Sequence, residues 1–294
     1  MATTLMLPGH LLSMATQATA KALCSGDLKH IDTELNIYSE AGIDFQIRVL
    51  ANLANKSGVT RELRPSGSSS PERLLKQAVN KARNPFLPFE PSMFVCDLGE
   101  THAVLLNKFN VVNNHLLIIT KHFEDQRSAL SKADLSYLSV AMQAFPALGF
   151  YNSGNEAGAS QKHRHLQLLP TAELATNIPI TPVVLKNTLH SVKYCLISSL
   201  KKNVDARTEQ LWEFYSRSIE QLSLNGGEGF LKPYNLLVFE DWALIVPRSQ
   251  ESVKGISINS LGFAGLFLVK NNEEMRTLQQ HGLLKALSAV AVTR

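Results

Sequence analysis

The sequence predicts an α+β protein in which helices flank an antiparallel sheet. Short apolar runs with strand character come in consecutive pairs separated by turn residues. Longer segments with apolar residues at helical spacing lie between these pairs and near the end of the chain. A doubly wound sheet needs regular alternation of strands and helices, which this sequence lacks, so the pattern favours an antiparallel sheet. We expect the chain to form an elaborated single compact unit.

The composition indicates a globular chain with a large core. Hydrophobic residues make up 45% and charged residues 18% of the 294 residues, and no apolar run approaches the roughly 18 residues that span a bilayer. The net charge of +4 is small and mixed along the chain, so we expect neither a long nucleic acid nor a membrane as a partner. Three scattered cysteines indicate no disulfide framework, and a cytoplasmic location fits them best.

The N-terminal third should contain a helix, a hairpin and a loop. Met1 to Ala22 lacks the continuous apolar core of a signal peptide and is interpreted as an amphipathic helix. Strands are expected at Ile31–Tyr38 and Ile43–Leu53, with Ala41-Gly42 as the turn of a hairpin. Lys56 to Pro71 is rich in Gly, Ser and Pro and is expected to be a mobile loop that can close over phosphates.

In the middle third, apolar runs predict four strands and one helix. Ser131 caps the helix, whose apolar residues repeat at helical spacing and which ends before Pro146. The first two strands are expected to pair antiparallel. The four strands are placed at Ala103–Leu106, His115–Thr120, Leu148–Tyr151 and His163–Leu169.

The last third begins with a helix and ends with helices. Thr208–Leu222 has helical spacing and stops before Gly226-Gly227. Tyr234–Phe239 and Trp242–Val246 are expected to be strands joined by a tight turn at Glu240-Asp241. We divide the chain into an N-terminal part, 1–175, that carries the site, and a C-terminal part, 176–294, that completes the same fold.

The strongest candidate site is the segment His163-Arg-His165-Leu-Gln167. Side chains alternate along a strand, so His163, His165 and Gln167 share one face and Arg164 points the other way. The preceding loop, Asn152 to Gln161, consists mostly of small residues whose backbone N–H groups can surround phosphate oxygens. The pattern predicts a loop that delivers an anion to the histidines.

These residue types suit nucleophilic attack on phosphorus. An imidazole with an ordinary pKa of about 6.5 is largely neutral near pH 7 and keeps a lone pair on one ring nitrogen. We assign His165 as the nucleophile; its other ring nitrogen needs an acceptor, often a backbone carbonyl. Gln167 can donate to a non-bridging oxygen in the transition state, a contribution of roughly 3 kcal/mol. His163 is expected to hold the loop or the phosphate chain.

Two other interpretations of the histidines stay open. Histidines at i and i+2 can ligate a metal, but no third ligand is evident nearby, so we assign no metal site. They can also be ordinary strand histidines, and Gly, Ser and Asn are common in hairpin loops. The loop and the histidines together indicate a phosphate-binding catalytic site more specifically than either feature alone.

At these residues the sequence resembles the histidine triad superfamily, in which the middle residue of a His-x-His-x-His or His-x-His-x-Gln strand is the nucleophile. Gln167 resembles the third residue of the transferase branch, which includes galactose-1-phosphate uridylyltransferase and the diadenosine tetraphosphate phosphorylases, or ATP adenylyltransferases. Further motifs are similar to the phosphorylase family. They are Lys108-Phe-Asn-Val-Val, His115-Leu-Leu-Ile-Ile-Thr120, Tyr151-Asn-Ser-Gly, Tyr234-Asn-Leu-Leu, Val246-Pro-Arg248 and Ile258-Asn-Ser-Leu-Gly-Phe-Ala-Gly265.

The resemblance implies a histidine-triad-like sheet and a set of nucleotide contacts. Asn107 is the candidate for the ribose, and Lys56 is similar to a family lysine that reaches the phosphate chain. Ala157 and Ala159 occupy positions where some family members carry hydroxyl side chains. The hydroxyl of Ser160 is therefore expected to be more important for phosphate binding. Arg248 is expected to meet an anion or to form a surface ion pair. The expected nucleotide and phosphate contacts are Lys56, Asn107, Asn152, Ser153, Gly154, Gly158, Ala159, Ser160 and Gln161.

The resemblance also implies the reaction, which is the phosphorolysis of diadenosine tetraphosphate to ADP and ATP through an adenylyl-histidine at His165. Expected partners are diadenosine tetraphosphate, ATP, ADP, AMP and inorganic phosphate, in a monomer or small homo-oligomer. We expect a divalent cation, magnesium, with the polyphosphate and no organic cofactor. Adenylyl sulfate is a further candidate substrate. A hydrolase of the histidine triad type and a non-catalytic dinucleotide-binding protein are the alternatives.

Overall fold

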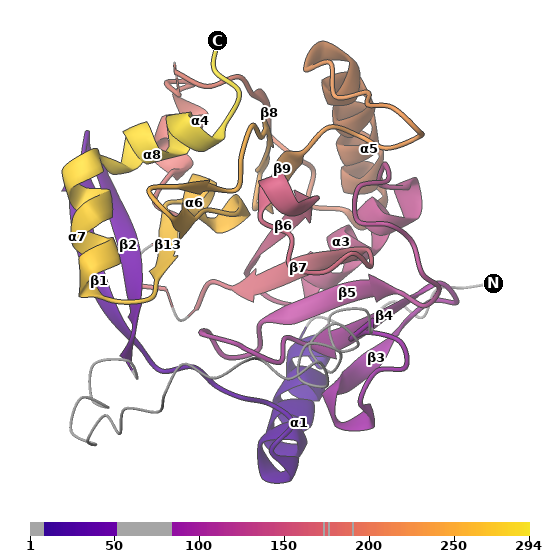
Figure 1. The fold of residues 1–294 in the computed structure, drawn as a ribbon. Helices are drawn as coiled ribbons and strands as arrows, with labels where there is room; N and C mark the ends of the chain where they lie inside the picture. Colours follow the sequence, from indigo (N-terminus) through magenta and orange to yellow (C-terminus); the bar gives the residue numbers. More distant parts are fainter. Residues whose placement is uncertain (1–8, 52–83, 173, 176, 190) are drawn as a thin grey trace, which may run out of the picture.

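An eight-stranded antiparallel sheet forms the centre of the molecule (Figure 1). The computed structural model describes residues 9–51, 84–172, 174–175, 177–189 and 191–294. In the sheet the strands lie in the order β3-β4-β5-β7-β6-β9-β10-β8, and each runs antiparallel to its neighbours. The strands are β3 (Phe94–Leu98), β4 (His102–Leu106), β5 (Leu116–Thr120), β6 (Ala147–Ser153), β7 (His165–Pro170), β8 (Cys195–Ser198), β9 (Tyr234–Phe239) and β10 (Trp242–Pro247).

Three helices cover one face of this sheet. Helices α1 (His10–Ser25), α3 (Lys132–Ala144) and α5 (Val204–Gln221) share a core with the sheet residues that point toward them. The predicted cap of α3 is confirmed, because the Ser131 side chain accepts from the Asp134 N–H while the Asp134 carboxylate accepts from the Ser131 N–H. Helix α5 begins earlier than predicted because the Asn203 side chain caps it.

A smaller layer covers much of the other face. The predicted hairpin is present as β1 (Thr33–Glu40) and β2 (Ile43–Leu50). Strand β13 (Leu266–Val269) then pairs with β2 in parallel, a long-range contact that the sequence pattern did not predict. The remaining elements of this layer are α4 (Thr181–Leu185), β11 (Ser252–Val253), β12 (Ile256–Ser257), α6 (Ser260–Ala264), α7 (Asn272–His281) and α8 (Leu283–Val290).

The predicted α+β class is confirmed, and its helices lie on both sides of the sheet. Strands β9 and β10 from the last third of the chain join the same sheet as the earlier strands. The division at residue 175 stays a prediction. Strands β3 and β8 were missed; they are the two edges of the sheet and are only partly buried, which leaves a weak hydrophobic signal.

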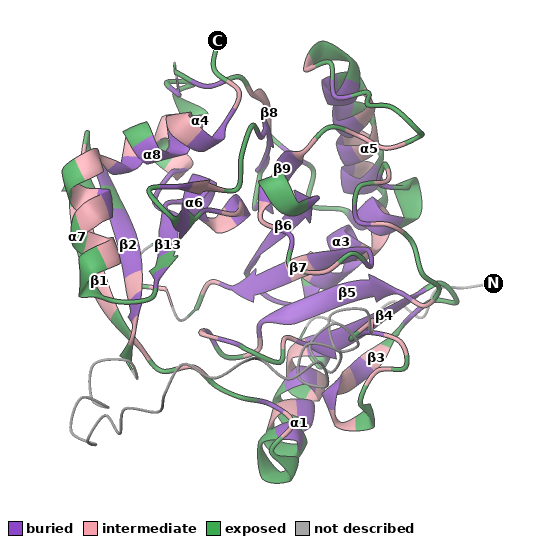
Figure 2. Cartoon of the chain, in the orientation of Figure 1, coloured by how far each residue is buried: buried purple, intermediate pink, exposed green. Residues whose placement is uncertain are grey.

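The middle of the sheet is covered on both faces. Figure 2 shows β5 and β6 buried along their whole length. A buried polar side chain in such a place is costly unless it is hydrogen-bonded. Among the described helices, none is long and apolar enough to cross a membrane.

Candidate active site

Strand β7 carries the candidate site at the centre of the sheet. It lies between β5 and β6, with His165 opposite Ile119 and Gln167 opposite Leu117. The strand begins at His165 rather than at the predicted His163, which instead forms an isolated bridge with Asp125. The predicted alternation is confirmed for the next residues, since Leu166 and Leu168 enter the core beneath the helices, whereas His165 and Gln167 line a cavity on the other face.

That cavity has a volume of about 280 Å³ and is lined by both polar and aromatic groups. Ser160 and Gln161 border it beside His165. Its other side is formed by residues 84–93, a segment that the sequence analysis did not connect with the site. The aromatic rings that line it are Phe86, Phe89 and Phe109.

His165 is held as a neutral imidazole. Its Nδ1 donates to the backbone carbonyl of His163 at 2.8 Å, so the lone pair remains on Nε2. The identity of this acceptor cannot be read from the sequence. Burial lowers the pKa of His165 to about 4, with a smaller lowering from the charge of His163, while the hydrogen bond to the His163 carbonyl opposes the shift. The ring is therefore ready to act as a nucleophile near pH 7.

His163 fixes the backbone in front of the nucleophile. Its Nε2 donates to the Thr120 carbonyl at 2.8 Å, and its Nδ1 accepts from the Asn84 side chain at 2.8 Å. Both ring nitrogens are thus engaged by protein groups, and His163 is not among the described residues that line the cavity. The ring of His163 therefore joins β5 to the segment around residue 84, and its carbonyl orients His165. The expected contact of His163 with the loop or the phosphate chain stays a prediction.

Gln126 is a further member of the site that the sequence analysis missed. It is 1% exposed, and its Oε1 accepts from the His165 N–H at 2.8 Å. Its Nε2 donates to the carbonyl of Asn152 at 2.8 Å and to that of His165 at 3.2 Å. One side chain therefore joins the start of β7 to the end of β6. Gln126 lies in the segment between β5 and α3, where the sequence shows neither helical nor strand periodicity that would indicate its role.

Asn152 opens the small-residue loop but does not face the cavity. Its Oδ1 accepts from the Asn235 side chain at 2.9 Å, from the Ser260 N–H at 2.9 Å and from the Ser260 hydroxyl at 2.6 Å. Asn152 and Ser153 are both buried and are not among the described lining residues. In this structure Asn152 anchors the loop to β9 and α6, and the expected nucleotide contacts of Asn152 and Ser153 stay predictions.

The loop itself uses several of the N–H groups that were expected to meet phosphate. Those of Ala157 and Ala159 donate to the Gly154 carbonyl, and that of Gly158 donates to the Asn155 carbonyl. Gly154, Gly158 and Ala159 do not line the cavity, in contrast to Ser160 and Gln161. Of the expected phosphate contacts in the loop, Ser160 and Gln161 border the cavity, and the contacts of all these residues stay predictions.

Glycine is required at position 158 by space and by backbone angle. Its φ is +88°, and a Cβ there would lie 2.6 Å from the Asn259 Cβ and 2.9 Å from the Asn259 Cα. The loop thus packs directly against the residue that caps α6.

Arg248 is buried and stabilises the small-residue loop by hydrogen bonds. It is 3% exposed, and its guanidinium donates to Asn235 Oδ1 at 2.6 Å, to the Ala157 carbonyl at 3.3 Å and to the Ile258 carbonyl at 2.7 Å. Across the residues that the structure describes, it forms no ion pair, so the expected surface ion pair is wrong. Burial lowers its pKa to about 10, and the nearby charge of Glu251 opposes that shift.

Asn107 lines the cavity but its amide is engaged by the protein. Its Oδ1 accepts from the Phe109 N–H at 3.4 Å, and its Nδ2 donates to His115 Nδ1 at 3.2 Å. The ribose contact of Asn107 stays a prediction. Lys56 lies outside the described residues. Within the described part of the chain, no three His, Cys, Asp or Glu residues gather as a metal site would require.

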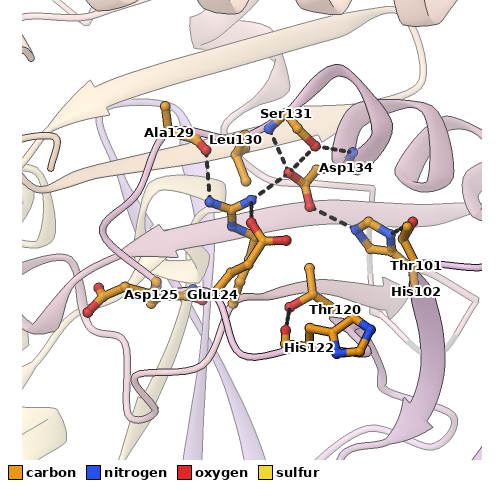
Figure 3. Close-up of polar contacts among 12 residues, drawn as sticks. Thr101, His102, Thr120, His122, Glu124, Asp125, Ala129, Leu130, Ser131 and Asp134 are labelled. Carbon is orange, nitrogen blue, oxygen red and sulfur yellow. Dashed lines mark hydrogen bonds and ion pairs between the residues drawn. The ribbon is translucent and has the colours of Figure 1, made fainter. Parts of the chain in front are cut away.

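A buried ionic cluster lies behind β7, on the helical face of the sheet. Figure 3 shows Asp134 between the start of its own helix at Ser131 and the ring of His102. Asp134 Oδ1 accepts from His102 Nε2 at 2.9 Å, and Oδ2 accepts from Arg164 at 3.1 Å. Arg164 also contacts Glu124 and donates to the Ala129 carbonyl at 2.9 Å. Arg164 lies between the two site histidines in sequence, so this cluster anchors their backbone.

The antiparallel sheet, strand β7 and the cavity that it borders fit a nucleotidyltransferase, which is the class that the family comparisons identify. Two family patterns cover the chain, the Ap4A phosphorylase N-terminal domain over residues 1–186 and the ATP adenylyltransferase C-terminal domain over residues 177–293. The chain belongs to the Ap4A phosphorylase family.

Relatives from yeast agree with this membership. Diadenosine 5',5'''-P1,P4-tetraphosphate phosphorylase 2 of Saccharomyces cerevisiae is 31% identical in a 244-residue alignment that covers 70% of this chain and 74% of that protein. Protein APA1 of the same yeast is 25% identical in a 302-residue alignment that covers 91% of this chain and 89% of that protein. The crystal structure of yeast Ap4A phosphorylase Apa2 in complex with AMP is 26% identical, with a TM-score of 0.73 over 98% of this chain and 99% of that one. The complex of Apa2 with Ap4A superposes with a TM-score of 0.75 at 24% identity over 98% and 99% of the chains.

Proposed function

We propose that this chain catalyses the phosphorolysis of diadenosine tetraphosphate to ADP and ATP. The observation that carries the proposal is the neutral His165 ring, which is tied at Nδ1 and borders the cavity beside Gln167. Family membership supports the substrate, since the yeast relatives are named for this activity. Adenylyl sulfate fits the same chemistry, because it also joins an adenylyl group to a good leaving group.

In the first step, His165 Nε2 attacks the α-phosphorus, a P–N bond forms, and the P–O bond to the departing ATP breaks. The adenylylated ring carries a positive charge, which the His163 carbonyl stabilises through the hydrogen bond from Nδ1. The Gln167 amide donates to a non-bridging oxygen as negative charge builds there. In the second step, an oxygen of inorganic phosphate attacks the same phosphorus, the P–N bond breaks, and ADP leaves.

The lining residues suggest how the nucleotide is held. Phe86, Phe89 and Phe109 offer ring faces and edges for a purine base, and Asn107 lies near enough to this wall for a ribose contact. Ser160 borders the phosphate end beside His165. We propose that magnesium binds mainly to the polyphosphate oxygens, since Glu90 is the one carboxylate among the described lining residues.

The identity of the products tests the proposed function. With diadenosine tetraphosphate and labelled inorganic phosphate, we expect equal amounts of ATP and ADP, with the label in ADP only. Chromatography of the nucleotides measures both. Formation of AMP at a rate independent of phosphate would identify a hydrolase instead, and tight binding without any product would identify a binding protein.

The pH dependence of the first step tests the protonation state of the nucleophile. Protonation of Nε2 removes the lone pair, and burial lowers the pKa of His165 to about 4. We therefore expect kcat/KM for adenylylation, measured without phosphate, to stay level from about pH 8 to about pH 5 and to fall at lower pH. Inorganic phosphate is omitted because it also changes its protonation state in this pH range, which would alter the pH profile. A fall centred near the ordinary histidine pKa of about 6.5 would contradict the assigned environment.

A further inference from the structure

A chain of hydrogen bonds runs from a backbone N–H to the catalytic glutamine. The Phe109 N–H donates to Asn107 Oδ1 at 3.4 Å, and Asn107 Nδ2 lies 3.2 Å from His115 Nδ1. On the far side of the ring, His115 Nε2 lies 3.0 Å from Gln167 Oε1. The chain therefore joins the loop after β4 to β7.

The first donor determines the direction of every later bond. A backbone N–H can only donate, so Asn107 must present its oxygen to Phe109 and its NH₂ group to His115. Nδ1 of His115 is then an acceptor, and the proton of the neutral ring lies on Nε2. That proton is donated to Gln167, whose oxygen is thereby occupied and whose NH₂ group is left for another partner.

The surroundings of His115 preserve this arrangement. The ring is buried and packs beside Phe150, with 5.8 Å between ring centroids. Burial lowers the pKa of His115 to about 4; the hydrogen bond with Gln167 opposes this shift, and the charge of His165 adds to it. A neutral ring has one N–H only, so it cannot donate in both directions.

We propose that His115 is a positioning residue that fixes the side-chain amide of Gln167 with its NH₂ group toward the bound phosphate. This inference rests on the proposed function of Gln167. In the reversed orientation, the amide oxygen would face a phosphate oxygen, so a hydrogen bond would be replaced by repulsion. The effect belongs to the transition state, where negative charge on that oxygen is greatest.

Kinetics of two His115 variants test this role. His115→Phe keeps a ring of similar size but removes the donor, and we expect kcat to fall by about tenfold or more with KM changed by less than about threefold. His115→Gln is the matched control, because its NH₂ group can reach the place of Nε2, and we expect it to recover most of the lost kcat. Thermal unfolding of each variant identifies loss of folding.

A double-mutant cycle separates orientation of Gln167 from a general structural role. In a Gln167→Ala background there is no amide to orient, so His115→Phe should cause little further loss of kcat. Equal losses of kcat in both backgrounds would show that His115 does not act through Gln167, and would overturn the inference.

The tautomer of His115 can be measured without any turnover. Long-range ¹H–¹⁵N spectra of the wild-type protein should show His115 protonated at Nε2 and His165 protonated at Nδ1. Protonation of His115 at Nδ1 would reverse the chain and overturn the inference even in a fully active enzyme. If the expected tautomers are found but phosphorolysis is absent, the proposed function fails and the hydrogen-bond chain stands.

Discussion

Replacement of His165 by alanine is expected to abolish adenylyl transfer. The substitution removes the atom that we propose attacks phosphorus, and loss of a covalent nucleophile lowers kcat by about 10⁴-fold or more in other enzymes that form covalent intermediates. In wild-type protein mixed with diadenosine tetraphosphate without phosphate, intact mass spectrometry should show one added adenylyl group. This addition should be missing in His165→Ala.

The matched control is His30→Ala, which removes an exposed histidine from a segment between α1 and β1. It should retain both the adduct and normal turnover. An adduct of unchanged amount in His165→Ala would show that another residue is the nucleophile. Nucleotide binding by His165→Ala, measured by calorimetry, should persist, because most lining groups of the cavity remain.

Replacement of Asp134 by alanine is expected to give the largest loss of stability. Asp134 is fully buried, caps α3 and accepts from both His102 and Arg164. Its removal leaves Glu124 as the one acidic side chain of the described residues in contact with the buried Arg164 guanidinium. Removing one partner of a buried ion pair lowers the free energy of unfolding by about 3–5 kcal/mol. Urea unfolding monitored by circular dichroism measures the change in free energy.

Asp205→Ala is a suitable control, since Asp205 is an exposed acidic residue in the first turn of α5. We expect it to change the free energy of unfolding by less than about 1 kcal/mol. A similar small change for Asp134→Ala would show that the buried cluster contributes little. Adenylylation by Asp134→Ala should also slow under folding conditions, because Arg164 would no longer anchor the backbone of the site.

The stabilisation by Asp134 should also depend on pH. Burial alone raises the pKa of this carboxyl, but the hydrogen bond from His102, the charge of Arg164 and the bonds from Ser131 outweigh it, and the net shift is downward. A carboxyl with a lower pKa in the folded state stabilises that state fully above its unfolded pKa of about 3.9. The contribution is then lost as pH falls through the folded value.

The sequence was sufficient for the features that depend on local pattern. Alternation along β7 placed His165 and Gln167 on one face, and Ser131 as a helix cap placed the start of α3. Paired apolar runs also predicted the hairpins at the centre of the sheet. Each of these features depends on residues that are near one another in the chain.

The rest of the site depends on contacts between distant residues. Gln126 bonds to Asn152 and His165, and nothing in its neighbouring residues indicates this. Arg248 was expected to meet an anion or to form a surface ion pair, yet carbonyl and amide oxygens of several segments surround it. The parallel pairing of β13 with β2 is non-local for the same reason.

The anchoring of the small-residue loop has a consequence for how the enzyme matures on the ribosome. The loop and His165 lie near the middle of the chain, whereas Asn235, Arg248 and Ser260, which hold that loop in place, emerge later. A nascent chain that has exposed only residues 1–170 therefore carries the His165 imidazole without the residues that shape its surroundings. Catalytic competence arrives with the final segments, and a stalled or truncated product would be inert toward cellular nucleotides.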